Sequence, residues 1–261
     1  MKTKESTLFL LTHKQARLKS KRLPGKVLKN FKGYSPLSVL ISRLKQSKII
    51  KNIIIATTRN NKDIKIVNFC KKNSLKFYRG DEKDVLGRYY KTATKYNIKN
   101  IIRITSDCPF IDTNVLDKMI LFFKKNKLDY YSNTYPEPST FPDGMDIEIF
   151  KYKALKISNK LAKNKSEREH VTVFMRYFKK FKSKRHDQKN NLSKYRLTID
   201  FFDDFKLFTK IIDHFGKKIV FASMNDLVKF LSKNQKLIIY QKKLIRNQSF
   251  YRDIIRDNLI D

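Results

Sequence analysis

The sequence has little cysteine, no long apolar stretch and few acidic residues for its length. Its two cysteines, Cys70 and Cys108, are too few for a disulfide framework, and neither has a His or Cys partner at metal-ligand spacing. A disulfide scaffold and a zinc module are therefore excluded, and a reducing compartment fits best. No stretch approaches the roughly 18 apolar residues of a membrane helix, and the apolar run at residues 7–12 is too short for a signal peptide. We expect a cytoplasmic protein without membrane insertion.

Basic residues outnumber acidic residues by 59 to 24, which gives a formal net charge of +35. Such a charge often indicates nucleic-acid binding, but no RNP, zinc-finger or helix-turn-helix signature accompanies it. The lysines are spread along the whole chain, together with many Asn, Ile and Phe residues, a set that the codons of an A+T-biased genome favour. Nucleic acid is therefore not the expected partner, although the positive field would speed the capture of small anionic substrates.

Apolar residues make up 41% of the chain and include 20 Phe and 13 Tyr. This is enough material for a sizeable core, so the composition excludes wholesale disorder. At 261 residues we expect one large α/β domain, or one domain with a small appendage. No fixed-period repeat is present, which excludes a solenoid.

Short apolar runs alternate with amphipathic stretches through the first half of the chain. This pattern is typical of βαβ units around a buried parallel sheet. We therefore predict a doubly wound α/β fold with a mostly parallel, Rossmann-like sheet whose ligands bind at the carboxyl ends of the strands. The predicted strands are 7–12, 52–57, 76–78, 100–105 and 129–132, and the predicted helices are 36–46, 63–73, 85–96 and 114–125.

The alternation changes after a proline-containing loop at residues 133–144. A strand at 195–199 and a helix at 204–215 then restore it. We divide the chain into a main domain, residues 1–224, which carries an inserted α+β lid segment, residues 139–194, and a helical C-terminal appendage, residues 225–261. Within the lid segment we expect a strand at 146–150, helices at 154–161 and 168–178, and a very basic stretch at 179–194.

A strongly basic loop, residues 13–26, follows the first predicted strand. Arg forks, Lys point charges and backbone N–H groups around Pro24-Gly25 can together bind several phosphates. The loop is not a P-loop, because the G-x-x-x-x-G-K-[ST] spacing is absent. From charge alone, a solvated basic loop is the alternative. The cations are Lys14, Arg17, Lys19, Lys21, Arg22 and Lys26.

Six segments occur along the chain in the order of a known set of motifs. They are Gln15-Ala16-Arg17 with Ser20 and Arg22-Leu23-Pro24-Gly25-Lys26; Arg79-Gly80-Asp81 with Asp84-Val85-Leu86; Arg103-Ile104-Thr105-Ser106-Asp107-Cys108-Pro109; Pro142-Asp143-Gly144-Met145-Asp146-Ile147-Glu148; Arg168-Glu169-His170-Val171-Thr172; and Asp200 with Asp203-Asp204. Together they resemble the cytidylyltransferases that activate acidic sugars. That family includes acylneuraminate and 3-deoxy-manno-octulosonate cytidylyltransferases and a branch named for spore-coat polysaccharide biosynthesis, which the chain resembles most.

The resemblance implies a nucleotidyltransferase that transfers CMP from CTP to an acidic sugar or related acid and releases pyrophosphate, for the synthesis of a surface glycan. It implies that Arg17 and Lys26 hold the departing phosphates. Related enzymes carry a Gln where this chain has Thr105-Ser106, so the base preference stays open. The implied nucleotide-binding residues are Gln15, Ala16, Arg17, Ser20, Arg22, Lys26, Thr57, Arg79, Asp84 and Ser106, and the implied acceptor-binding residues are Asp143, Asp146, Glu148, Glu169 and His170.

Two carboxylates follow predicted strands. Asp107 comes just after the strand 100–105, and Asp200 occupies the same place after the strand 195–199. Such a pair suits Mg²⁺, which takes one or two protein oxygens and otherwise prefers water and phosphate. We therefore predict that Asp107 and Asp200 hold a catalytic Mg²⁺, with Arg17 and Lys26 as the other catalytic residues. A helix N-cap is the alternative for each carboxylate, because a helix follows both.

The resemblance also implies a homodimer that forms through the lid segment. Phe174, Tyr177, Phe178 and Phe181 lie there at helical spacing, and the alternative is that they pack within their own subunit. Two other functions stay open at this point. One is a nucleotidyltransferase that uses another triphosphate or a phosphorylated acceptor. The other is an anion-binding or nucleic-acid-binding protein that keeps the fold without catalysis.

Overall fold

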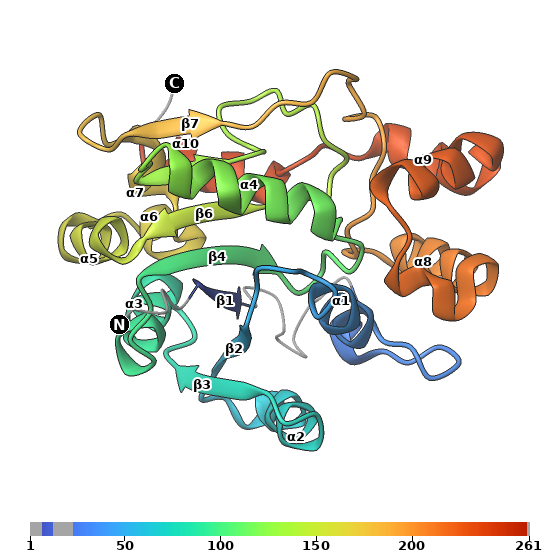
Figure 1. Ribbon diagram of the computed structural model, residues 1–261, viewed down its shortest axis with the longest axis horizontal. Helices are drawn as coiled ribbons and strands as arrows, with labels where there is room; N and C mark the ends of the chain where they lie inside the picture. The colour runs from blue at the N-terminus through green and yellow to red at the C-terminus, as the bar shows by residue number, and fades with distance from the viewer. Residues whose placement is uncertain (1–6, 13–22, 260–261) are drawn as a thin grey trace.

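A seven-stranded sheet forms the centre of the protein (Figure 1). The structure is a computed structural model that describes residues 7–12 and 23–259. The described strands lie in the order β3-β2-β1-β4-β6-β5-β7, and β6 alone among them runs antiparallel to its neighbours. The mostly parallel sheet that the sequence predicts is therefore confirmed. The strands are β1 (Thr7–Thr12), β2 (Asn52–Thr58), β3 (Lys76–Gly80), β4 (Asn100–Thr105), β5 (Tyr130–Ser132), β6 (Glu148–Lys151) and β7 (Ser183–Arg185).

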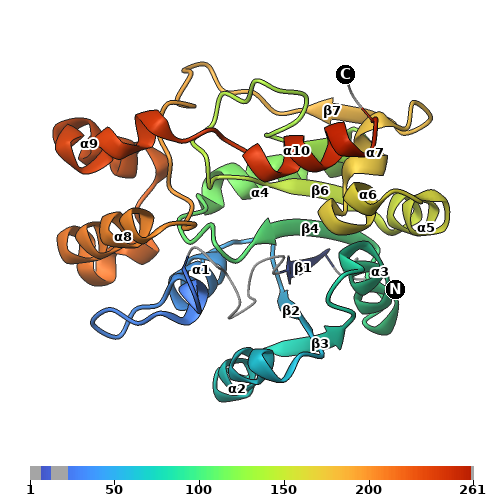
Figure 2. The same ribbon diagram turned by 180° about the vertical axis from the view of Figure 1, so that it is seen from behind.

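Helices cover both faces of the sheet, as Figures 1 and 2 show from opposite sides. One face is buried by Leu40 of α1, Ile66 of α2 and Leu116 of α4, and the other by Leu86 of α3 and Leu155 of α5. Each of these helices has an apolar stripe, which is why it packs on the sheet. The helices are α1 (Pro36–Leu44), α2 (Ile64–Lys72), α3 (Val85–Lys95), α4 (Thr113–Lys125) and α5 (Tyr152–Leu161), with short 3₁₀ helices η1 (Lys26–Leu28) and η2 (Asn61–Asp63).

The segment 195–199 is extended but is not a strand of the sheet, contrary to the prediction. Its backbone bonds to loops instead: Leu197 N–H donates to the Asp143 carbonyl at 2.6 Å, and Ile199 N–H donates to the Asp107 carbonyl at 2.9 Å. An apolar sequence pattern indicates burial and extension but does not identify the pairing partner. The side chains of this segment pack with α8 (Phe202–Phe215), the 3₁₀ helix η3 (Gly216–Val220) and α9 (Met224–Lys233) in a second core beside α1.

The lid segment, residues 139–194, is built into the sheet rather than laid over it. It supplies β6, and it supplies β7 from the basic stretch where no strand is predicted. The predicted helix 168–178 is two shorter helices, because Val171 has a φ of 68° between them. Such a φ is incompatible with a continuous right-handed helix. The two helices are α6 (Lys165–His170) and α7 (Val173–Tyr177).

The aromatic residues of the lid segment contact one another and their own core. Phe178 lies 5.0 Å from Phe174 and 4.8 Å from Phe181, measured between ring centroids, and both of these partners pack on the α3–α5 core. Tyr177 is 39% exposed and contacts the ring of Tyr135. The internal-packing alternative therefore accounts for Phe174, Phe178 and Phe181, and the homodimer stays a prediction.

The C-terminal residues, predicted as an appendage that is helical throughout, pack on the main body and are interrupted at residues 244–247. After α9 come a 3₁₀ helix η4 (Gln235–Lys243) and α10 (Gln248–Arg256). Figure 2 shows α10 lying over α6 and α7. There Asp253 contacts His170 at 3.0 Å, and Asp257 accepts a hydrogen bond from Ser166 N–H at 2.6 Å. Among the described helices none is long and apolar enough to cross a membrane.

Candidate active site

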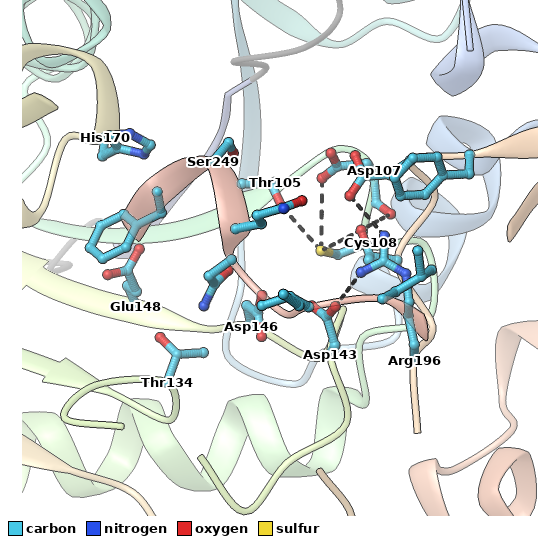
Figure 3. A pocket seen from close by; sticks show the side chains of 18 of the residues that line it. Thr105, Asp107, Cys108, Thr134, Asp143, Asp146, Glu148, His170, Arg196 and Ser249 are labelled. Carbon is cyan, nitrogen blue, oxygen red and sulfur yellow. Dashed lines mark hydrogen bonds and ion pairs between the residues drawn. The ribbon is translucent and has the colours of Figure 1, made fainter. Parts of the chain in front are cut away.

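A pocket of about 240 Å³ lies beyond the carboxyl end of β4, where ligands bind in open parallel sheets. In Figure 3, Glu148 and His170 lie on one side of the pocket, and Asp107 and Arg196 lie on the other. The C-terminal tail, residues 243–250, crosses it and supplies seven of its lining residues. The pocket is therefore assembled from β4, the lid segment, the 196–201 segment and the tail.

The ammonium group of Lys26 joins the two predicted metal ligands. Its Nζ lies 2.8 Å from Asp107 Oδ2 and 2.8 Å from Asp200 Oδ1. The side chain of Lys26 is 1% exposed, while those of Asp107 and Asp200 are 14% and 20% exposed. Burial opposes ionisation of all three groups, but their mutual attraction prevails, so the pKa of each carboxyl is lowered and the pKa of Lys26 is raised. The structure thus brings Lys26, Asp107 and Asp200 together.

Neither carboxylate caps a helix. The N-cap of α4 is Asp112, whose side chain accepts from Asn114 N–H and Val115 N–H. At the start of α8, Asp204 accepts hydrogen bonds from the N–H groups of Asp200 and Phe201 at 2.8 and 2.9 Å. The N-cap alternative for Asp107 and Asp200 is therefore excluded.

A buried arginine, Arg196, binds Asp200 and two further carboxylates. It forms ion pairs with Asp143, with Asp200 at 2.8 Å and with Asp204 at 3.1 Å. The sequence interpretation did not select Arg196, which lies within an apolar run. A charged residue in such a run was the available signal, since a buried guanidinium requires acidic partners.

Asp143 and Asp146 lie on the pocket wall and share Arg246 of the tail. Arg246 Nη2 donates to Asp146 Oδ1 at 2.6 Å, and its Nε lies 3.9 Å from Asp143 Oδ1. Burial and the neighbouring Asp146 raise the pKa of Asp143 to about 6. Burial likewise raises the pKa of Asp146, although Arg246 opposes this. Sequence patterns gave no indication that the tail reaches these two residues.

Glu148, at the start of β6, binds two arginines and two hydroxyl groups. It forms ion pairs with Arg103 and, at 3.0 Å, with Arg176, and the hydroxyls of Tyr130 and Thr172 donate to it at 2.6 Å each. Burial opposes its ionisation, but the two arginines lower the pKa of Glu148 to about 2. Glu148 is therefore ionised at neutral pH.

The remaining predicted site residues lie outside this pocket. Thr57 contacts Asp63, Arg79 donates to the carbonyls of Thr58 and Asn60, and Asp84 caps α3 and binds Arg168 through both oxygens. Ser106 directly follows β4, and its buried hydroxyl has no partner among the described residues. Glu169 is in α6 and does not line the pocket. Gln15, Ala16, Arg17, Ser20 and Arg22 lie outside the described residues.

The donor set fits Mg²⁺. Asp107 and Asp200 are hard oxygen ligands that already converge on one cationic group. The described residues contain no cluster of three or more His, Cys, Asp or Glu side chains that could hold a metal. Mg²⁺ does not need one, because it binds through one or two carboxylates and completes its shell with water and phosphate.

Comparison with known proteins identifies the family of the chain. Residues 15–254 match the family model described as cytidylyltransferase. The chain is 35% identical over 248 residues to the uncharacterized protein MJ1063 of Methanocaldococcus jannaschii, covering 92% of this chain and 96% of that protein. It is 31% identical over 237 residues to the spore coat polysaccharide biosynthesis protein SpsF of Bacillus subtilis, covering 87% and 94%.

Solved structures show the same fold. A cytidylyltransferase from Leptospira borgpetersenii superposes with a TM-score of 0.81 at 34% identity, covering 90% of this chain and 96% of that one. A CMP:2-keto-3-deoxy-manno-octonic acid synthetase complexed with CTP superposes with a TM-score of 0.58 at 13% identity, covering 80% and 99%, and supports the fold alone. The family resemblance seen in the sequence is thus confirmed, and the chain belongs to the cytidylyltransferase family of nucleotidyltransferases.

Proposed function

We propose that the protein transfers a cytidylyl group from CTP to a hydroxyl group of an acidic sugar and releases pyrophosphate. The observation that carries this proposal is the convergence of Asp107 and Asp200 on one buried cationic position beside a polar pocket, in a chain of the cytidylyltransferase family. The name of the Bacillus subtilis relative supports a role in the synthesis of a surface glycan. The need for CTP suits the cytoplasm.

In the proposed reaction, the acceptor hydroxyl gives its proton to solvent water, and its oxygen attacks the α-phosphorus of CTP. A bond forms between the acceptor oxygen and phosphorus, and the bond to the pyrophosphate oxygen breaks. Bound between Asp107 and Asp200, Mg²⁺ would neutralise charge on the phosphoryl oxygens and lower the pKa of the attacking hydroxyl.

Lys26 has a second part in this proposal. In the structure its ammonium group binds two carboxylates, so binding of phosphate by Lys26 requires it to exchange a carboxylate partner for a phosphate oxygen. Asp107 and Asp200 would hold a divalent cation with the same oxygens that bind Lys26, so Lys26 would be released toward a phosphate oxygen. Lys26 would then remain beside the triphosphate as a fixed positive charge.

The pocket supports an acceptor that carries several hydroxyl groups. Asp143, Asp146, Glu148 and His170 line it, and carboxylate and imidazole groups accept hydrogen bonds from sugar hydroxyls. Each of the three carboxylates also binds at least one arginine, so the wall is not a field of uncompensated negative charge. An acidic acceptor is therefore compatible with this pocket, although most of the acceptor-binding residues predicted from the sequence are Asp and Glu.

The test is the release of pyrophosphate from CTP with Mg²⁺ and a panel of sugar acids that includes N-acetylneuraminate and 3-deoxy-manno-octulosonate. We expect release only when CTP, Mg²⁺ and one of the acids are present together. Equal release from UTP or ATP would contradict the assignment to CTP. No release with any acid, together with tight and salt-sensitive binding of RNA, would support the non-catalytic alternative instead.

A further inference from the structure

Two buried arginines at one end of the pocket share a single carboxylate. Arg103 and Arg176 both form ion pairs with Glu148, and their side chains are 14% and 10% exposed. Within the described part of the chain, no other carboxylate lies within ion-pair distance of either arginine. Glu137, the acid of the adjacent loop, instead accepts a hydrogen bond from Asn247 at 2.8 Å. The two arginines therefore carry one positive charge more than the single carboxylate that they bind.

Both arginines also have an unused donor. The Nε–H groups of Arg103 and Arg176 are buried without a hydrogen-bond partner among the described residues. Burial of a guanidinium group destabilises the protein when one of its donors has no acceptor and when it shares its only carboxylate with a second arginine, unless another group compensates the charge. Because both residues line the pocket, a bound anion is able to supply the missing charge.

The N-terminus of α10 reaches the same end of the pocket. Gln248, Ser249 and Phe250 form its first turn and line the pocket. The N-cap residue, Asn247, makes no side-chain cap. The Arg176 guanidinium lies 4.8 Å from the centroid of the Phe250 ring, so this first turn adjoins the arginines. A helix N-terminus favours negative charge for the same reason that the arginines do.

We propose that Arg103, Arg176 and the first turn of α10 form a carboxylate-binding subsite, which we call the anion end of the pocket. The inference rests on the proposed function and adds to it the group by which the acceptor is recognised. The carboxylate of the acceptor binds at the anion end, and its reacting hydroxyl points toward Asp107, which lies on the opposite side of the pocket from Glu148 (Figure 3). The C-terminal tail thus contributes directly to acceptor specificity.

The first experiment compares acids with their uncharged forms. Whichever acid of the panel reacts best is assayed against its methyl ester with wild-type protein and Arg176→Gln. We expect the ester to have a KM at least about tenfold higher than the acid, and Arg176→Gln to raise the KM for the acid by at least about tenfold, because a charge-assisted hydrogen bond is lost. The KM for CTP should not move. Equal KM values for acid and ester, or a phosphate monoester such as glucose 1-phosphate as the preferred acceptor, would overturn the proposal.

The second experiment needs no substrate. Ser249→Glu places a carboxylate in the first turn of α10, where it supplies the missing negative charge from within, and Ser249→Gln is its uncharged match. We expect ligand-free Ser249→Glu to melt about 2–4 °C above Ser249→Gln, and to have lost binding of the acid in calorimetry. If Ser249→Glu melts at or below Ser249→Gln, the anion end does not lack a negative charge, and the inference is wrong.

These outcomes separate the inference from the proposed function. If the acids bind and Ser249→Glu is the more stable variant, but no triphosphate yields pyrophosphate, the transfer reaction is wrong and the anion end stands. If CTP is consumed with a neutral sugar as readily as with an acid, the transfer reaction stands and the anion end is wrong.

Discussion

Replacement of Lys26 by methionine separates the electrostatic role of this residue from its bulk. The substitution keeps most of the buried side-chain volume but removes the ammonium group between Asp107 and Asp200. Asp200 retains an ion pair with Arg196 at 2.8 Å. Asp107 forms no ion pair other than that with Lys26 among the described residues. The variant therefore leaves a largely buried carboxylate without its cation.

The size of the effect follows from burial. Removal of one partner from a fully buried ion pair costs about 3–5 kcal/mol. The side chains of Asp107 and Asp200 are 14% and 20% exposed, so water partly compensates them and we expect a loss of about 2–3 kcal/mol in the free energy of unfolding. For a chain of this size that corresponds to a melting temperature about 5–10 °C lower. Mg²⁺ should restore part of the loss, because it binds the folded state and replaces the missing charge.

Thermal unfolding with and without Mg²⁺ measures this effect, with Lys32→Met as the matched control. Lys32 also contacts an aspartate, Asp213, at 2.6 Å, but the two side chains are 67% and 37% exposed. An exposed pair contributes about 0–1 kcal/mol, so the control should melt close to wild type and ignore Mg²⁺. If Lys26→Met melts like Lys32→Met, or if Mg²⁺ stabilises Lys26→Met no more than wild type, the reasoning about this cluster is refuted.

Four further outcomes are expected. Asp107→Asn and Asp200→Asn should each lower the rate of pyrophosphate release by at least about a hundredfold. The double variant should lose far less than the product of the two effects, because both residues serve one unit. Near-normal turnover in either single variant would show that the residue is not a metal ligand. The pKa of Glu148 is about 2 in the folded protein against 4.5 ordinarily, so its contribution to stability is complete above pH 4.5 and is lost as the pH falls toward 2. In urea unfolding, the free energy of unfolding of Glu148→Gln should therefore fall less steeply with decreasing pH than that of the wild type. An equally steep fall would contradict this prediction. Gly144→Ala should destabilise the protein severely, because φ is +95° and a Cβ would lie 2.3 Å from Thr198 N. Gly33→Ala is the control, because Gly33 has a positive φ but no atom within 4 Å of the added Cβ. Unfolding followed by circular dichroism should show a loss of only about 1–2 kcal/mol in its free energy of unfolding. Light scattering at micromolar concentration should give the mass of a homodimer, and a strictly monomeric mass would show that the exposed Tyr177 and its neighbours form no dimer interface.

The first half of the fold was predictable because its elements carry local signals. The strand 100–105 is a buried apolar run, and α4 begins where Asp112 can cap it. The position of Asp107 at the carboxyl end of β4 follows from that alone. Local signals fail where pairing is long-range: the run 195–199 has the composition of a buried strand, yet it pairs with the loops at Asp143 and Asp107. Nothing within the run itself distinguishes these two outcomes.

The candidate site was predictable as a set of carboxylates but not as a set of ion pairs. Motif comparison selects Asp143, Asp146 and Glu148, and all three line the pocket. The arginines that bind them were missed, since Arg176, Arg196 and Arg246 are ordinary basic residues in a chain with 59 of them. Tertiary structure determines which of the many basic side chains are buried against a carboxylate. Those ion pairs in turn determine whether the pocket favours an anionic or a cationic ligand.

The ion pairs of the site join segments that lie far apart in sequence. Arg103 of β4 binds Glu148 of β6, Arg196 binds Asp143, and Lys26 binds Asp107 and Asp200.

Asp84 and Arg168 show the same arrangement away from the pocket, where the bidentate pair ties α3 to α6 of the lid segment. A sequence motif containing Asp84 is therefore explained without any contact to a ligand. Each motif supplies one partner of a pair whose other partner comes from a different motif, so the motifs must occur together for the charges to be buried at all. Loss of one partner is expected to act first on the position of the other segment, and only through that position on the chemistry.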